Sequence, residues 1–189
     1  MRHIMKHAVI VSGGNINTDF ALDFLKKNTD ENTLLIAADR GLEFFERTGL
    51  VPDIAVGDFD SLSESGKKFL ETLSNTEIIR LRPEKDDSDT QSAACLAMDR
   101  GMKRIMILGA TGNRVDHLMA NFGLLVLGRE RGCEIILADP WNYMKLIESG
   151  TVLKRSEQFG KYVSFFSIGG DVPGLTLKGF KYPLNRHYQ

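Results

Sequence analysis

The sequence predicts an α/β protein, with an N-terminal domain built on a parallel sheet and a small antiparallel β domain after it. Three observations support this prediction. Short runs rich in Val, Ile and Leu alternate with helical segments as far as Pro140, which is typical of a parallel sheet covered by helices on both faces. From Trp141 onward the segments are short, partly alternating and separated by Gly or Pro turns. The length of 189 residues suits one domain plus a small second unit.

The expected strands of the first domain are short apolar runs, most of which end in glycine or in polar residues. Each run, together with the glycine or polar residues that follow it, falls within residues 7–14, 33–41, 52–61, 77–83, 104–112 or 133–140. Ligands of open α/β sheets bind outside the carboxyl ends of the strands. The polar ends of these runs are therefore where we look for chemistry.

Helices are expected between these runs, at residues 17–28, 42–49, 64–75, 88–101 and 115–132. Two of them carry clear end signals. Gly49 is placed to end the second helix. Ser88 is followed three positions later by Gln91, which is the spacing of a capping box at a helix start.

The domain boundary is expected at about Pro140, which gives an α/β domain at 1–140 and a β domain at 141–189. About fifty residues are too few to bury a sizeable core alone. The second domain should therefore pack on the first or on a second copy of the chain, and we expect a homodimer. Its aromatic residues Trp141, Phe165 and Phe166 are more typical of a core than of a stacking surface.

Composition limits the kind of partner. The chain has 24 Lys+Arg against 25 Asp+Glu, so it lacks the basic footprint of a nucleic-acid-binding protein. Its apolar runs are too short for a membrane span or a secretory signal. Cys95 and Cys133 are isolated in apolar settings, as reduced thiols of a cytosolic protein are. We expect a cytoplasmic protein that binds neither nucleic acid nor membrane.

Aspartates follow the second and third expected strands. Asp39 comes after the second, and Asp58 and Asp60 after the third, in "GDFDS". In an extended segment, alternation places Asp58 and Asp60 on the same side, with Phe59 on the other. Two like charges so placed repel each other unless a positive group lies between them. The pair favours metal binding over a plain surface turn.

More acidic residues follow the fourth strand, in "EKDDSDT", which contains Lys85, Asp86 and Asp89. So many carboxylates at one edge predict a divalent cation, and all-oxygen ligands favour Mg²⁺, or Mn²⁺ as the alternative, over zinc. Mg²⁺ usually binds one or two carboxylates together with substrate phosphates. A nucleoside triphosphate is therefore the expected substrate. Asp89 fits the first turn of a helix equally well.

Glycine loops follow the first and fifth strands, and they would let backbone N–H groups approach phosphate. Arg114, in "GATGNRVDH", is available for bidentate phosphate contact. The candidate ATP- or phosphate-binding residues are Gly13, Gly14, Asp39, Lys85, Gly109, Thr111, Gly112 and Arg114. Asp116 and His117 also fit structural roles at a helix start, and His117 and Asn121 share a helix face on which they could support one another.

Four motifs agree in order and spacing with one known family. "ADRG", "GLVPDIAVGDFDS", "EKDDSDTQSA" and "ILGATGNRVDHLMAN", within residues 37–125, resemble thiamine pyrophosphokinases. The resemblance implies an α/β catalytic domain, a C-terminal β-sandwich for thiamine binding and dimerisation, and a homodimer with active sites between subunits. It also implies transfer of a pyrophosphoryl group from ATP to the hydroxyethyl oxygen of thiamine, which gives thiamine diphosphate and AMP.

The resemblance also implies roles for single residues. The metal ligands are Asp58, Asp60 and Asp86, the catalytic residues are these three with Asp89 and Asp116, and the substrate-binding residues are Asp89, Asp116, His117 and Asn121. Arg40 stands where many members have Gly, and Ser88 replaces a common Thr. The family usually continues, after the position of Gln189, through a Ser-Asn-Glu segment that helps form the thiamine pocket.

Three alternative functions stay open at this point. A pyrophosphokinase acting on a pterin alcohol would use the same residues. An aspartyl-phosphate phosphatase has a similar D-x-D at a strand end, with the first Asp as nucleophile, but it leaves "DDSD" and "GATGNRVDH" unexplained. A thiamine or nucleotide sensor would bind without turnover, and it has no need of the whole acidic set.

Overall fold

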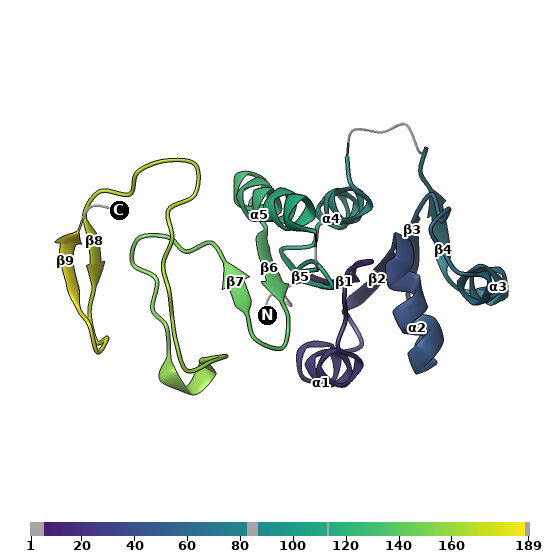
Figure 1. The fold of residues 1–189 in the computed structure, drawn as a ribbon, viewed down its shortest axis with the longest axis horizontal. Helices are drawn as coiled ribbons and strands as arrows, with labels where there is room; N and C mark the ends of the chain where they lie inside the picture. The colour runs from purple at the N-terminus through teal and green to yellow at the C-terminus, as the bar shows by residue number, and fades with distance from the viewer. Residues whose placement is uncertain (1–5, 83–86, 113, 188–189) are drawn as a thin grey trace, which may run out of the picture. The chain divides into compact units, whose positions relative to one another are not determined.

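The computed structural model describes residues 6–82, 87–112 and 114–187. The chain forms two compact units, Met1–Glu157 and Gln158–Gln189. The first unit is built on a seven-stranded sheet with the strand order β4-β3-β2-β1-β5-β6-β7. Figure 1 shows this sheet with helices on both faces.

The strands of the sheet are β1 (His7–Val11), β2 (Leu34–Ala38), β3 (Ile54–Gly57), β4 (Glu77–Arg80), β5 (Arg104–Leu108), β6 (Glu134–Ala138) and β7 (Tyr143–Lys145). The first six are parallel to their neighbours, and β7 is antiparallel to β6. All six strands expected from the apolar runs are confirmed, as is the parallel α/β class.

The helices are α1 (Thr18–Asn28), η1 (Asp39–Gly41), α2 (Leu42–Thr48), α3 (Glu64–Thr72), α4 (Asp89–Asp99) and α5 (Val115–Glu130). The expected ends are confirmed: Gly49 follows α2 with φ of 70°, and the Ser88 hydroxyl accepts a hydrogen bond from the Gln91 N–H at the start of α4. The Gln91 side chain donates to Asp87 Oδ1, 2.5 Å away.

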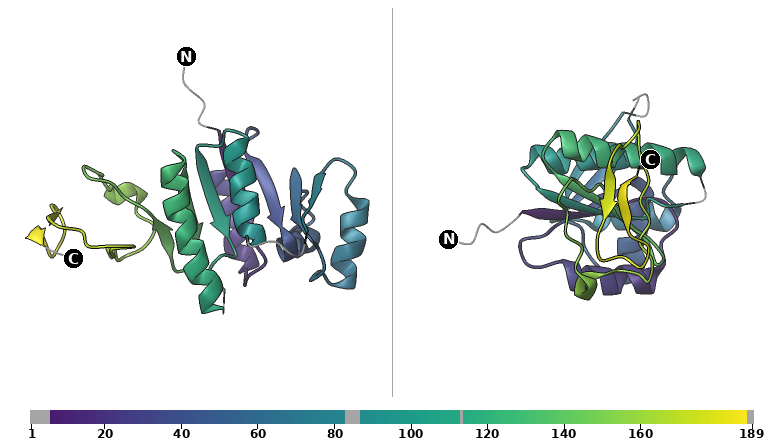
Figure 2. Two further views of the ribbon diagram at one scale, coloured as in Figure 1. Left: turned by 90° about the horizontal axis from the view of Figure 1, so that it is seen from above. Right: turned by 90° about the vertical axis from the view of Figure 1, so that its left-hand side faces the viewer.

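Two apolar layers fill the space between the sheet and its helices. Alternate residues of β1 face opposite sides, as strand geometry requires. Ala8 and Ile10 pack in the layer that contains buried residues of α4 and α5. Val9 and Val11 pack in the layer that contains buried residues of α1, α2 and α3. α4 and α5 lie side by side over their face of the sheet (Figures 1 and 2).

The strand order reverses direction between β1 and β5, at the centre of the sheet. Such a switch point opens a crevice outside the carboxyl ends of the strands, where ligands of these folds bind. In-register pairing keeps the strand ends level: Val11 pairs with Leu108 and with Ala37, and Leu108 pairs with Ala138. The loops after β2, β1, β5 and β6 therefore follow one another along a single edge.

The first unit extends to Glu157, past the boundary that the sequence predicts at Pro140. The reason is that β7 adds an antiparallel strand to β6 through the pairs Ala138–Tyr143 and Ile136–Lys145. The short 3-10 turn η2 (Arg155–Glu157) ends this unit. The assignment of thiamine binding and dimerisation to residues 141–189 stays a prediction.

The second unit contains the small antiparallel sheet that the sequence predicts, formed by β8 (Leu175–Leu177) and β9 (Leu184–His187). Phe165 packs edge-on against Phe180, with ring centroids 5.6 Å apart. The structure describes the side chains of residues 158–186, and none of these side chains is buried. The unit therefore has no core of its own, as its length predicts.

Two aromatic residues differ from the expectation that they belong to a core. Trp141 lies in the turn between β6 and β7 of the first unit, and Phe166 lies in the second unit; each is 81% exposed. The core interpretation is wrong for both. Apolar character alone does not report burial, because much of a folded protein's surface is apolar.

Candidate active site

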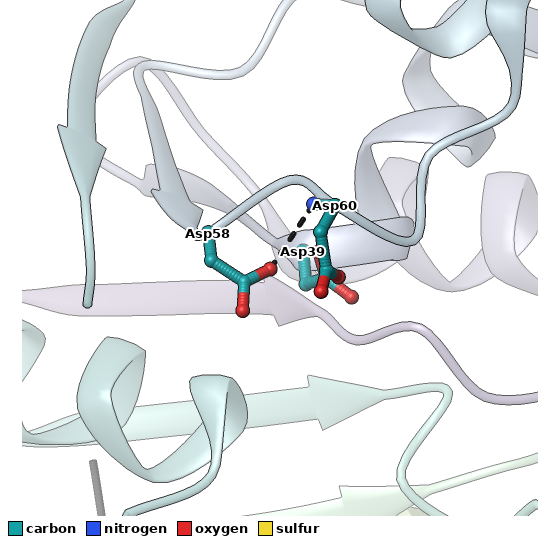
Figure 3. Close-up of side chains that lie close together, drawn as sticks. All are labelled: Asp39, Asp58 and Asp60. Atoms are coloured by element: carbon teal, nitrogen blue, oxygen red, sulfur yellow. Dashed lines mark hydrogen bonds between the residues drawn. The ribbon is translucent and has the colours of Figure 1, made fainter. Parts of the chain in front are cut away.

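Three carboxylates meet at the ends of β2 and β3. Asp39 directly follows β2 and Asp58 directly follows β3, and the ends of the two strands are paired in the sheet through Ala38 and Val56. Oxygen atoms of Asp39, Asp58 and Asp60 all lie within 4.8 Å of one another, and Figure 3 shows the three side chains converging. We call these three residues the acidic cluster.

A sharp turn brings the two aspartates of "GDFDS" together. Phe59 has φ of 63°, so the segment is not extended, and the alternation argued from the sequence is the wrong reason for their proximity. The Phe59 side chain is 4% exposed and packs in the core. The Asp60 N–H donates to Asp58 Oδ1 at 3.1 Å (Figure 3). A buried aromatic anchor and an Asx-type turn therefore hold both carboxylates on one side.

Close backbone approach completes the acidic cluster. A Cβ atom on Gly57 would lie 3.0 Å from the Cα atom of Asp39, so glycine permits the two strand ends to lie this near to each other. Asp39 itself has φ of 47°, a left-handed conformation that costs energy for a residue with a side chain. Strain of this kind is typical of positions held by function.

Asp39 is the most constrained member of the acidic cluster. The Ser61 hydroxyl donates to its Oδ2 at 2.5 Å. Its Oδ1 is buried and has no hydrogen-bond partner in the part of the chain that the structure describes. Burial raises the pKa of this carboxyl above its ordinary value, in spite of the Ser61 hydrogen bond, and the negative charges of Asp89 and Asp58 raise it further.

The acidic cluster has the properties of a cation site. The hydrogen bond and the charge of Asp58 raise the pKa of Asp60 above its ordinary value, because two neighbouring carboxylates share one region of space. An unsatisfied buried oxygen on Asp39 is a ready ligand. An all-oxygen donor set of this kind suits Mg²⁺ or Mn²⁺. The residues present therefore fit the divalent cation that the sequence predicts.

Helix α4 brings a fourth carboxylate to this edge. Asp89 is the first residue of α4, and its negative charge raises the pKa of Asp39. The next residue, Thr90, is buried and bonds the equally buried Ser12 at 2.5 Å between hydroxyl oxygens. This contact fixes the start of α4 against the end of β1. Lys85 and Asp86, two predicted site residues, lie outside the described residues.

The two glycine loops lie against each other at the switch point. The Gly14 N–H donates to the Gly109 carbonyl at 3.1 Å, and a Cβ on Gly14 would lie only 2.2 Å from that oxygen. Gly109 has φ of 70°, and a Cβ there would lie 2.4 Å from the Ser12 carbonyl. Only glycine fits at these two positions, and the loops present backbone at the centre of the edge.

The start of α5 carries an exposed ion pair. Arg114 Nε and a terminal nitrogen of its guanidinium contact the two oxygens of Asp116 at 3.2 and 2.5 Å. This hydrogen-bonded pair lowers the pKa of Asp116 to about 2. The His117 side chain is exposed. The buried Asn121 amide donates to the Ala110 carbonyl at 2.8 Å, so Asn121 supports the second glycine loop.

Comparison with known proteins agrees with this geometry. The family model for the catalytic domain of thiamin pyrophosphokinase matches residues 25–137, and the model for the vitamin B1 binding domain matches residues 150–189. A thiamine pyrophosphokinase of Bacillus subtilis is 35% identical over 181 residues, which cover 96% of this chain and 83% of the relative. The chain belongs to the thiamine pyrophosphokinase family.

Solved structures of the family share the fold. The thiamine pyrophosphokinase of Bacillus subtilis superposes with a TM-score of 0.84 at 34% identity, covering 97% of this chain and 84% of that chain. The thiamin pyrophosphokinase of Geobacillus thermodenitrificans gives a TM-score of 0.74 at 27% identity, covering 97% and 82%. The predicted family, an enzyme class, is thereby confirmed, and the comparisons support none of the three alternative functions. Among the described residues, no helix is long and apolar enough to cross a membrane.

Sequence reasoning missed several contacts that organise the candidate site. Ser61 bonds Asp39, and its signal was present in "GDFDS" as a hydroxyl next to the second aspartate. Ser12 and Thr90 are 78 positions apart and meet only in the folded chain. Asp39 was predicted as a phosphate contact and as one of the aspartates that follow the strands, and the structure places it within the acidic cluster.

Proposed function

We propose that this chain transfers a pyrophosphoryl group from ATP to the hydroxyethyl oxygen of thiamine, giving thiamine diphosphate and AMP. The observation that carries the proposal is the acidic cluster beside two close-packed glycine loops, in a chain of this family. Pyrophosphoryl transfer depends mainly on in-line positioning and on neutralising charge. A cation held by carboxylates, together with backbone groups of the glycine loops, would position the phosphates and neutralise their charge.

The acidic cluster of Asp39, Asp58 and Asp60 is the proposed Mg²⁺ site, with Asp86 as a further predicted ligand and Mn²⁺ as the alternative ion. When bound, the cation neutralises charge on the transferred phosphates. The strained Asp39 backbone and the Ser61 hydrogen bond orient one ligand. The Phe59 anchor orients the other two.

The glycine loops and Arg114 are the proposed phosphate contacts. The loops at residues 13–14 and 109–112 bring backbone to the centre of the edge, where charge would develop on AMP as it leaves. The Gly14 N–H is not among the proposed contacts, because it already binds the Gly109 carbonyl. Arg114 is exposed at the end of the second loop and is oriented by Asp116. Lys85 is proposed as a further contact to ATP on the strength of the motif alone.

Asp89 is the better candidate to accept the proton of the thiamine alcohol. Asp116 is a weak base, because its pKa of about 2 reflects a strong preference for the charged, Arg-paired form. The charge of Asp89 acts on Asp39 of the acidic cluster. A loose transition state asks little of either base. His117 and Asn121 remain proposed substrate contacts, although the Asn121 amide already binds Ala110.

We also propose a homodimer and a cytoplasmic location. The second unit exposes large aromatic side chains, among them Tyr162 at 82% and Tyr182 at 75%, and apolar surface of this extent is typical of an interface. A second copy of the chain would cover it. Cys95 and Cys133 are free, which suits a reducing compartment.

Purified protein tests the function directly. With ATP and Mg²⁺, we expect AMP release to depend on thiamine and not on hydroxymethylpterin, and thiamine diphosphate to appear in the mass spectrum. Asp58→Asn should abolish AMP release while circular dichroism stays unchanged. Asp23→Asn is the matched control, because Asp23 is an exposed carboxylate that pairs with Lys27 on α1. AMP release with the pterin alone, or at an unchanged rate in Asp58→Asn, would contradict the proposal.

A further inference from the structure

Trp141 lies at the same edge of the sheet as the candidate active site. It follows β6, and the pairs Val11–Leu108 and Leu108–Ala138 keep the ends of β1, β5 and β6 level. The turn that contains Trp141 is therefore the next loop along the edge after the glycine loop of β5. Its ring is 81% exposed, which is unusual for the largest apolar side chain of a folded domain.

The backbone of Trp141 is firmly held although its ring is exposed. Asp139 Oδ1 accepts hydrogen bonds from the N–H groups of Trp141 at 2.8 Å and Asn142 at 2.7 Å. The Asn142 amide bonds the same carboxylate, at 3.0 Å to each oxygen. Asp139 is only 9% exposed. These hydrogen bonds therefore fix the backbone from which the Trp141 ring projects.

A chain of hydrogen bonds connects this turn to the phosphate-binding loops. The Thr111 side chain hydrogen-bonds Asp139, and this bond and those from Asn142 hold the pKa of Asp139 below its ordinary value against the effect of burial. Thr111 belongs to the same loop as Gly109, which accepts the N–H of Gly14. The backbone of Trp141 is thus connected through Asp139 and Thr111 to the loop at the centre of the edge.

The chemistry of the proposed function limits how ATP can lie along this edge. In-line transfer places the incoming alcohol and the leaving AMP on opposite sides of the β-phosphorus. The β- and γ-phosphates belong with the cation at the acidic cluster, after β2 and β3. β1 and β5 lie between β2 and β6, so three strand spacings, about 14 Å, separate the ends of β2 and β6. An extended nucleotide running away from the cluster reaches the end of β6.

We infer that Trp141 is the stacking platform for the nucleobase of ATP, an inference that rests on the proposed function. Stacking on an aromatic ring accepts any base with a large π face and reads few of its hydrogen-bonding groups. ATP and GTP are therefore expected to serve comparably as donors, and pyrimidine nucleotides less well. The base adds to ground-state binding and takes no part in bond breaking, so its loss changes KM more than kcat.

Fluorescence tests the contact itself, because the chain has one tryptophan. AMP and ATP should quench the emission of the native protein in a saturable way, whereas ribose 5-phosphate, tripolyphosphate and thiamine should not. Quenching by thiamine and not by AMP would place the alcohol substrate at Trp141 and overturn the inference. Quenching by neither thiamine nor AMP would also overturn it. So would an emission that changes with protein concentration in the absence of ligand, because another copy of the chain would then cover the ring.

Variants test its contribution. Trp141→Ala should raise the Kd for AMP and the KM for ATP about 10-fold, as loss of one stacking contact does, with kcat and tripolyphosphate binding little changed. Trp141→Phe should restore most of the affinity. Equal affinities in all three proteins would contradict the inference. Thiamine diphosphate formation by the native protein is measured separately. If the native protein forms no thiamine diphosphate, the proposed function is contradicted. If it forms thiamine diphosphate and the Trp141 variants bind AMP and ATP equally well, only the stacking contact is contradicted.

Discussion

Asp39 illustrates how one residue is specialised at this edge. Its backbone adopts a left-handed conformation, its Oδ2 binds Ser61, and its Oδ1 is buried and unsatisfied by described residues. The strained backbone and the buried, unsatisfied oxygen cost free energy, whereas the Ser61 hydrogen bond stabilises the carboxylate. A bound cation would offset the cost of the buried oxygen, because that oxygen would become a ligand and its negative charge would be neutralised. Asp39 should therefore contribute to metal binding more than to stability.

Asp39→Asn tests this directly. We expect Mg²⁺ affinity, measured by calorimetry, to fall by about 10-fold or more, because a charged ligand is lost. In EDTA the melting temperature should stay level or rise by roughly 3 °C, which corresponds to about 1 kcal/mol in a chain of this size, because one of several like charges is removed. An unchanged Mg²⁺ affinity would exclude Asp39 as a ligand, and Asp23→Asn serves as the control.

Cys133 gives a prediction about pH. Burial raises the pKa of its thiol to about 11, from an ordinary value of 9.0. The neutral thiol is therefore favoured in the folded state, so its contribution to stability is complete below pH 9 and is lost as pH rises towards 11. The free energy of unfolding should decrease by about 1–2 kcal/mol more between pH 8.5 and 10.5 in the native protein than in Cys133→Ala. Parallel pH profiles of the two proteins would contradict the assignment.

At the scale of elements, glycines allow the strand ends to lie close together. Gly14, Gly57 and Gly109 each stand where a Cβ would lie within 3.0 Å of a backbone atom of another loop. The sequence shows them only as glycines after strands, and their reason is the spacing between neighbouring segments. Gly123, within α5, is different, because a Cβ atom there would have open space around it.

Gly14→Ala and Gly123→Ala form a matched pair. Gly14→Ala should destabilise the fold by about 2–3 kcal/mol and weaken AMP binding, because the new methyl group collides with the Gly109 carbonyl. Gly123→Ala should stabilise the fold by roughly 0.5–1 kcal/mol, since alanine is the better helix former. Urea unfolding measures both, and a neutral Gly14→Ala would mean that the loops move apart easily.

The elements themselves could be predicted from the sequence because their signals are local. Apolar runs gave the six parallel strands, and Gly49 and Ser88 gave helix ends. The turn at Phe59 could not be predicted, because its left-handed backbone is held by core packing and not by a turn residue. The exposure of Trp141 was missed for a different reason. The hydrogen bonds that hold its backbone are local, from the N–H groups of Trp141 and Asn142 to Asp139, but apolar character alone does not report whether a ring is buried.

At the scale of the whole molecule, the two units differ in whether they have an apolar core. The first has an apolar layer on each face of its sheet. The second has a two-stranded sheet and no buried side chain among residues 158–186. A unit of this kind gains stability by covering its apolar side chains, and a second copy of the chain is the proposed cover.

Sedimentation equilibrium tests the dimer. We expect a dimer in the native protein, and we expect Phe166→Ser to weaken it about 10-fold or more, because large aromatic residues contribute strongly to interfaces. Val51→Ser is the control, since Val51 is an exposed apolar residue of the first unit, 54% exposed. A native protein that stays monomeric at all concentrations would contradict the proposed assembly.

The proposed reaction is defined by which phosphates of ATP are transferred. ATP labelled separately at the α-, β- and γ-phosphorus, incubated with thiamine, Mg²⁺ and the native protein, measures this most directly. We predict that the β and γ labels appear together in thiamine diphosphate and the α label in an equal amount of AMP. Transfer of the γ label alone, with ADP as the second product, would contradict pyrophosphoryl transfer at this site.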